Sequence, residues 1–126
     1  MRLLLDTHVL LWRMRGRPTL SDDAETAIRS ADELLVSAIS FVEIGVKVAV
    51  GKLRLPSGVR EYVLDSGARI LGVAPEHGLE IASLPLHHRD PFDRLLIAQA
   101  RCEGLTIITA DERFGTYDVS VLRATN

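Results

Sequence analysis

Short apolar runs alternate with longer amphipathic stretches along nearly the whole chain. The apolar runs at residues 2–5, 34–37, 70–73, 105–109 and 119–122 have the length and composition of β-strands. Several of them are almost continuously apolar, which is typical of parallel strands covered by helices on both faces. The pattern therefore predicts a mostly parallel sheet with five candidate strands.

Helices are predicted between these strands, and several have recognisable ends. Ser21 and Ser57 are candidate N-caps, Asp90 with Pro91 can open a helix, and Gly104 can end it. The predicted helices span residues 7–15, 22–30, 38–50, 58–65, 75–84 and 91–103, with a short helical turn at 112–114. This alternation predicts an α/β fold, in which functional side chains gather beyond the carboxyl ends of the strands.

Composition narrows the class of protein without naming a function. The 126 residues are 47% hydrophobic and 25% charged, so we expect one globular domain spanning residues 1–126. Cys102 is the only cysteine, which excludes an internal disulfide and disfavours a cysteine zinc site. A single cysteine fits a reducing compartment, so we expect a cytoplasmic protein in which Cys102 is a small buried hydrophobe.

Neither of two apolar stretches reads as a targeting or membrane segment. Asp6 interrupts the N-terminal leucine run too early for a signal peptide. The stretch 34–50 contains Glu43 and Lys47, each costing about 2.5–3.5 kcal/mol at a bilayer centre, so we expect a buried helix there. The net charge of −2 does not indicate a broad nucleic-acid-binding surface, although local basic clusters can still bind phosphates.

Two aspartates follow predicted strands. Asp6 comes directly after the strand 2–5, and Asp111 comes shortly after the strand 105–109. The carboxyl ends of parallel strands are where α/β proteins place their chemistry. Each residue could instead cap the helix that follows it, because Asp often does so after a strand.

Glu43 and Asp93 are acidic residues in otherwise apolar helical surroundings. Glu43 shares a narrow polar stripe with Ser40 and Lys47, which could also be a capping box or an i, i+4 ion pair. Asp93 stands at the tip of an apolar stripe, although it could simply favour the helix dipole. Asp90, at the cap position, is the better candidate for a purely structural acid.

Four acids near one end of a sheet repel one another. One like-charge pair about 4 Å apart costs about 4 kcal/mol at an effective dielectric constant near 20. A divalent cation would neutralise such a cluster, and carboxylate oxygens suit Mg²⁺ or Mn²⁺ better than zinc. A carboxylate-held metal in an open α/β site points to phosphoryl chemistry.

Four segments resemble the motifs of PIN-domain ribonucleases, in the form found in the VapC toxins. They are residues 4–12 (LLDTHVLLW), 37–44 (SAISFVEI), 88–100 (HRDPFDRLLIAQA) and 109–114 (TADERF). The resemblance runs in order over nearly the whole chain. It implies a three-layer fold with a five-stranded parallel sheet in the order 3-2-1-4-5.

The resemblance also implies an activity and partners. It implies a Mg²⁺- or Mn²⁺-dependent endoribonuclease toxin, acting on RNA such as tRNA or rRNA, that forms a homodimer and is inhibited by a VapB-type antitoxin. Asp6, Glu43, Asp93 and Asp111 match the acidic positions and are the expected catalytic and metal-binding residues. A further polar position is expected at Thr109 or Glu112, and Thr7 is a candidate supporting hydrogen-bond partner.

The remaining candidates have ordinary structural explanations beside functional ones. We expect His87 and His88 to be solvated loop residues and His8 to be a helix-surface residue near the site. Basic residues gather near the helix ends and could hold a phosphate backbone; they are Arg13, Arg15, Arg17, Lys47, Lys52, Arg54, Arg89 and Arg94. Trp12, Met14 and Phe41 fit either the core or a groove for an antitoxin helix.

Two other classes of function were weighed. A haloacid-dehalogenase-like phosphatase needs an aspartate where this chain has His8, and a P-loop signature is absent. A non-enzymatic PIN-like binding module would have lost carboxylates that this chain retains. Stabilisation by Mg²⁺ or Mn²⁺ would separate the nuclease from the binding module.

Overall fold

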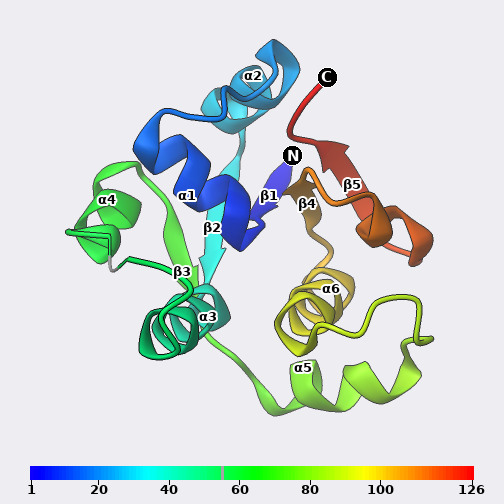
Figure 1. Cartoon of the computed structure of the whole chain (residues 1–126). Helices are drawn as coiled ribbons and strands as arrows, with labels where there is room; N and C mark the ends of the chain where they lie inside the picture. Colours follow the sequence, from blue (N-terminus) through cyan, green and yellow to red (C-terminus); the bar gives the residue numbers. More distant parts are fainter. Residues whose placement is uncertain (55) are drawn as a thin grey trace.

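The computed structural model describes residues 1–54 and 56–126, and it has alternating strands and helices (Figure 1). The strands are β1 (Arg2–Leu5), β2 (Glu33–Ser37), β3 (Arg69–Leu71), β4 (Thr106–Thr109) and β5 (Ser120–Arg123). The helices are α1 (Thr7–Arg15), α2 (Asp22–Ser30), α3 (Ala38–Ala49), α4 (Val59–Asp65), α5 (Pro75–Glu80) and α6 (Pro91–Glu103), with 3₁₀ turns η1 (Ile81–Ser83) and η2 (Glu112–Thr116).

The five strands form one parallel sheet in the order β3-β2-β1-β4-β5, which confirms the predicted fold and strand order. The chain moves outward from β1 to β2 and β3, and then crosses to β4 on the other side of β1. In register, Leu4 of β1 lies between Leu35 of β2 and Ile107 of β4. This reversal beside β1 is the kind of switch point at which α/β proteins bind ligands.

Alternating side chains of the central strand supply two cores, one on each face of the sheet. Leu3 and Leu5 pack in the cluster that includes residues of α1, α2 and α4, whereas Leu4 packs in the cluster that includes α6 and Phe114. All three leucines are buried. Because both faces are covered, the strands are apolar on both sides, which explains their nearly continuous hydrophobic sequence.

Most predicted helix ends are confirmed. The Ser21 side chain accepts a hydrogen bond from the Ala24 N–H, and Asp90 accepts from the first turn of α6. The expected cap at Ser57 is wrong, because α4 begins after Gly58, whose φ of 70° is in the left-handed region. The predicted helix 75–84 is α5 followed by η1.

Two predictions about burial are wrong. The stretch 34–50 is not one buried helix: it forms β2 and then α3, and Val42, Val46 and Val50 of that stretch are exposed. Cys102 is also exposed. Over the described residues, none of the helices combines the length and the apolar character that crossing a membrane requires.

Candidate metal centre

The carboxyl ends of β1 and β4 bring two of the expected site residues to one edge of the sheet. Asp6 follows β1, and its backbone N–H donates to the Ile108 carbonyl of β4 at 3.0 Å. Asp111 lies two residues after β4, at the N-cap of η2. Neighbouring parallel strands thus place both residues at the switch point beside β1.

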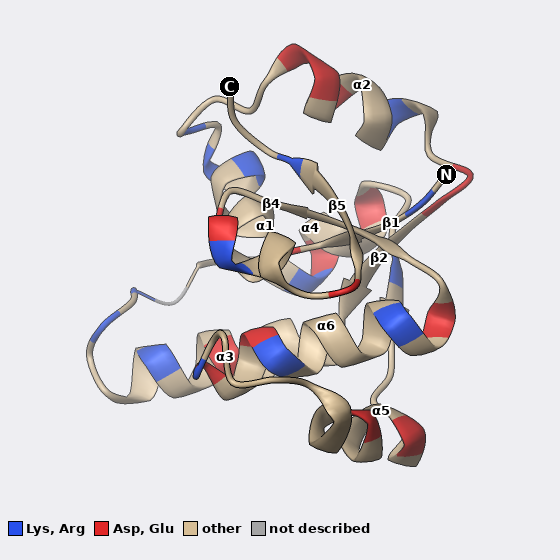
Figure 2. Cartoon of the chain, turned by 90° about the vertical axis from the view of Figure 1, so that its right-hand side faces the viewer, with Lys and Arg blue, Asp and Glu red and all other residues tan. Residues whose placement is uncertain are grey.

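Two helices contribute the other expected acids. Glu43 lies in the middle of α3 and Asp93 in the first turn of α6. These helices pack against each other, and Figure 2 shows their acidic segments close together below the sheet. Glu43 is fully buried and Asp93 is 5% exposed.

Three of the four carboxylates are buried with one oxygen partnered and one oxygen free. The Thr109 hydroxyl donates to Oδ2 of Asp6 at 2.8 Å, and Lys47 donates to Oε2 of Glu43 at 2.6 Å. Oδ1 of Asp6 and Oε1 of Glu43 have no partner.

Asp93 follows the same pattern, with Oδ2 2.7 Å from Nε2 of His88 and Oδ1 without a partner. Within the described residues, four buried side-chain polar atoms lack a partner, and three of them are oxygens of these carboxylates. Native proteins rarely leave such atoms unpaired unless an ion or ligand completes them.

Asp93 joins two overlapping groups of possible ligands. One ligand atom from each of Glu43, Asp90 and Asp93 lies within 4.8 Å of the others. The same holds for His88, Asp93 and Asp111. Asp90 was predicted to be purely structural; its cap bonds to the N–H groups of Phe92 and Asp93 are confirmed, but it also faces this cluster.

The electrostatics of the cluster favour a bound cation. Burial raises the pKa of Asp93 to about 8, and the negative charges of Asp6, Asp90, Glu43 and Asp111 add to that effect. Burial also raises the pKa of Asp6, against the lowering effect of the Thr109 hydrogen bond. The cluster is therefore hard to ionise fully without a compensating positive charge.

Asp111 is in a different environment. Its carboxylate is partly exposed and accepts hydrogen bonds from the backbone N–H, Nε and Nη2 of Arg113. The Arg113 side chain holds the pKa of Asp111 below its usual range. Asp111 thus caps η2 and also faces the cluster, with Oδ2 3.4 Å from Nε2 of His88.

The alternatives for the other acids can now be decided. Asp6 is at the N-cap position of α1 but makes no side-chain cap bond. Ser40 and Glu43 do not form a capping box, because α3 begins at Ser37, but the predicted ion pair between Glu43 and Lys47 is present.

The supporting polar residues also have definite places. Thr109 holds Asp6, whereas Glu112 is exposed and lies 4.0 Å from Arg123. Thr7 donates to the Ser40 hydroxyl at 2.8 Å, so its bond links α1 to α3 and does not reach a carboxylate.

His88 was expected to be solvated, and this prediction is wrong. The side chain is buried between Asp93 and Asp111. The sequence offered only its proximity to Asp90 as a signal, because its burial depends on residues distant in the chain. His87, by contrast, is exposed as predicted.

A further group of possible ligands, formed by Glu76, His77 and Glu103, does not suit a metal. Nδ1 of His77 accepts a hydrogen bond from the Ala74 N–H at 2.9 Å. The proton of the neutral ring is therefore on Nε2, 3.3 Å from Glu103, where a metal would need a lone pair. This group is explained as an ordinary hydrogen-bonded contact between α5 and α6.

The carboxylate cluster, by contrast, fits a hard divalent cation. Its donors are oxygens, and several are buried without partners. Such donor sets suit Mg²⁺ and Mn²⁺.

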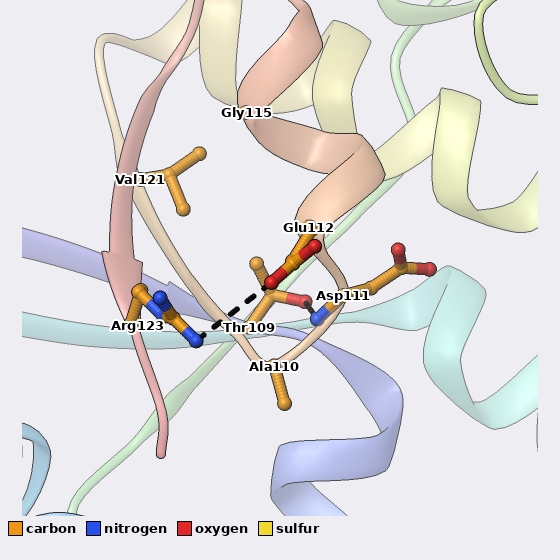
Figure 3. Close-up of a pocket in the computed structure, with 7 residues that line it drawn as sticks. All are labelled: Thr109, Ala110, Asp111, Glu112, Gly115, Val121 and Arg123. Atoms are coloured by element: carbon orange, nitrogen blue, oxygen red, sulfur yellow. Dashed lines mark hydrogen bonds and ion pairs between the residues drawn. The ribbon is translucent and has the colours of Figure 1, made fainter. Parts of the chain in front are cut away.

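Surface hollows lie on either side of the cluster. One, of about 220 Å³, is lined by residues 109–112 together with Gly115, Val121 and Arg123. Figure 3 shows the Asp111 carboxylate pointing away from Val121 and Arg123, so this hollow lies behind the cluster. The other, of about 230 Å³, runs from Thr7 and His8 past Lys47 to Lys52.

Comparisons with known proteins agree with this arrangement. The PIN domain family model matches residues 3–119. Ribonuclease VapC22 of Mycobacterium tuberculosis is 33% identical over 118 residues, which are 91% of each chain.

Solved structures share the fold. VapBC2 from Rickettsia felis, crystallised with a DNA fragment from its promoter, matches with a TM-score of 0.73 and 15% identity over 98% of both chains. DNA-bound VapBC from Salmonella typhimurium matches with a TM-score of 0.72 and 15% identity over the same share. By its match to the family model and its identity with VapC22, the chain belongs to the PIN domain family, among its VapC-type members.

Proposed function

We propose that this chain is an endoribonuclease that depends on Mg²⁺ or Mn²⁺ and acts as the toxin of a VapBC-type pair. Asp6, Glu43, Asp93 and Asp111 are its proposed metal-binding and catalytic residues, within a single PIN domain of residues 1–126. The observation that carries the proposal is the set of three buried carboxylates that converge with unpartnered oxygens. The name of its relative, Ribonuclease VapC22, supports the same activity.

The residues of the chain have separate tasks in this proposal. A bound divalent ion would lower the pKa of a water molecule and neutralise charge on a phosphodiester. Thr109 fixes the side chain of Asp6, and Lys47 fixes that of Glu43, so that one oxygen of each faces the ion. Hydrolysis by water in line with the leaving oxygen is expected to leave 3′-hydroxyl and 5′-phosphate ends.

RNA is the proposed substrate because basic side chains gather beside the acidic cluster. Figure 2 shows basic segments near the end of α1 and after α3 on the same side of the molecule. Arg15 and Lys52 line two adjoining hollows, one of which reaches Thr7 beside Asp6. Cations placed there can hold phosphates without reading base sequence.

The activity can be tested on a mixed pool of tRNA and rRNA fragments. Cleavage is expected with Mg²⁺ or Mn²⁺, and not with EDTA. Asp93→Asn is expected to reduce it to background, because the neutral amide cannot replace the carboxylate. Asp23→Asn, at an exposed position of α2, is the matched control and should cleave normally. Equal cleavage by Asp93→Asn and the wild type would contradict the assignment.

A non-enzymatic binding module is the alternative function. Metal-induced thermal stabilisation separates the two, because a module without a functional site gains nothing from the ion. An absence of both cleavage and stabilisation would favour the binding module.

The proposed partners are a VapB-type antitoxin and a second copy of this chain. The relatives from Rickettsia felis and Salmonella typhimurium are VapBC complexes, which supports the antitoxin. Trp12, Met14 and Phe41 are partly buried against the core, and the first two also line surface hollows. The homodimer and the cytoplasmic location stay predictions; light scattering would give about twice 13.9 kDa for a dimer.

A further inference from the structure

His88 is held in place from three sides, although it lies in a loop. Its backbone N–H donates to the Tyr117 hydroxyl at 2.8 Å, and its carbonyl accepts from Nη1 of Arg94 at 3.3 Å. Its ring contacts the buried ring of Phe114 edge to face, with centroids 6.1 Å apart. A residue so constrained has one available orientation.

Arg94 builds the loop around this histidine. The side chain is buried on α6, next to Asp93, and donates to the carbonyls of Ile81, Leu84 and Pro85 as well as to that of His88. The Tyr117 hydroxyl in turn donates to the Pro85 carbonyl at 2.8 Å. The loop is therefore fastened to the same helix that carries Asp93.

The hydrogen bonds of the ring determine which nitrogen carries the proton. The Asp90 N–H points at Nδ1 of His88 at 3.4 Å, so Nδ1 is the acceptor. The proton of the neutral ring is then on Nε2, which lies 2.7 Å from Oδ2 of Asp93 and 3.4 Å from Oδ2 of Asp111. A nitrogen that carries a proton is a donor and not a metal ligand.

We infer that His88 is a positioning residue, whose Nε2–H bridges Oδ2 of Asp93 and Oδ2 of Asp111 and leaves Oδ1 of Asp93 facing the proposed cation. The inference rests on the proposed function and adds a residue that acts through the carboxylates. Hydrogen bonds from neighbouring groups orient ligating carboxylates, and their loss weakens metal binding roughly 10- to 100-fold. Without the bridge, Asp93 could turn and the two carboxylates could separate.

The inference can be tested by Mn²⁺ titration of the full chain, read by calorimetry. His88→Leu removes the donor and is expected to weaken Mn²⁺ binding by at least about tenfold. His88→Gln retains an N–H donor at the end of the side chain and should keep most of the affinity. His87→Leu, at the exposed neighbouring position, is the matched control and should bind as the wild type does.

Nitrogen NMR of the wild-type histidines provides a readout that does not depend on activity or on any variant folding. His88 is expected to carry its proton on Nε2 both without metal and with Mg²⁺. Loss of that proton on adding Mg²⁺, with transfer to Nδ1, would make His88 a direct ligand and overturn the inference.

The outcomes of the titration are separable. If the wild type binds no Mn²⁺, the proposed function fails, and the inference fails with it. If the wild type binds Mn²⁺ and His88→Leu binds it within about twofold of the wild type, only the inference fails.

Discussion

Asp93 is the residue at which burial and charge oppose each other most strongly. Its pKa of about 8 lies far above the value near 3.9 expected in the unfolded chain, because burial and the neighbouring acids disfavour the ionised form. A carboxyl group with a raised pKa in the folded state stabilises the fold fully below its unfolded pKa. That contribution is lost as pH rises through the folded pKa.

The metal-free protein is therefore expected to lose thermal stability as the pH rises from about 4 through about 8. Asp6 acts in the same direction, because its pKa is also raised. Asp111, with a lowered pKa, acts in the opposite direction only in the acid range. Melting temperatures in EDTA between pH 5 and pH 9 would show the decline.

Asp93→Asn provides the control for that decline. The neutral amide should flatten the curve and melt above the wild type at pH 8 without metal. A wild-type melting temperature that rises between pH 6 and pH 9 would contradict this assignment of the charge.

Metal stabilisation should show the converse dependence on pH. Since a cation and a proton compete for the Asp93 carboxylate, the rise in melting temperature on adding Mn²⁺ should grow from pH 6 to pH 8.5. Asp93→Asn should show little of this rise. A Mn²⁺ effect that is independent of pH, or equal in both proteins, would mean that the ion binds elsewhere.

Single residues differ in how well the sequence predicts them. Asp6 and Asp111 could be placed from the strands that precede them, since parallel strands share one carboxyl edge. His88 could not, because Arg94 and Tyr117 bury it through contacts that no local pattern encodes. Its neighbours in sequence gave only the ordinary expectation for a polar loop.

At the scale of the element, α3 depends on its first residue. The Ser37 hydroxyl accepts from the Ile39 N–H and donates to Oε1 of Gln99 on α6. Ser37→Ala removes the cap and leaves a buried amide oxygen unpaired, so it should cost about 1–3 kcal/mol of unfolding free energy. Ser57→Ala is the matched control in urea denaturation, because Ser57 precedes α4 without capping it, and should change stability by less than about 0.5 kcal/mol.

The segment from η1 to α6 depends on Arg94. Arg94→Met keeps much of the buried stem but leaves several loop carbonyls without a donor, so a loss of about 3 kcal/mol or more is expected. Arg101→Met on the same helix removes only a partly exposed ion pair with Glu80, worth about 1 kcal/mol at most. Equal losses in the two variants, measured by urea denaturation, would contradict the role given to Arg94.

Helix ends were predictable where a side chain itself makes the cap, as at Ser21 and Asp90. The misplaced Cys102 shows what was overlooked. Successive helical residues turn by about 100°, so Cys102 lies about 200° around α6 from the buried Ala100. The periodicity of the helix therefore pointed away from the core at that position.

For the whole molecule, strand order was the part that local patterns left open. Alternating strands and helices are compatible with several parallel sheets, and only the resemblance to PIN domains implied that β1 and β4 are neighbours. That pairing brings Asp6 to the same sheet edge as Asp111, 105 positions later in the chain. The acidic cluster is thus a consequence of topology.

Topology also places the cluster beside a basic surface, and this leads to a prediction about RNA binding. The hollow of about 730 Å³ after α1 is lined by Arg15, Arg17, Lys52 and Arg54, among others, and adjoins the hollow that reaches Thr7. Each phosphate contact to single-stranded RNA contributes about 0.7 to the slope of log affinity against log salt. In an Asp93→Asn background, Arg15→Gln with Lys52→Gln should therefore weaken RNA binding and lower the slope by about 1.4.

Fluorescence anisotropy of a labelled single-stranded RNA at several salt concentrations would measure the slope. Arg29→Gln, at an exposed position of α2 outside both hollows, is the matched control and should leave the slope unchanged. An equal drop in both proteins would mean that the RNA responds to net charge alone. An unchanged slope in the double variant would place the RNA on another face, because removing cations that contact phosphates must reduce the number of counterions released.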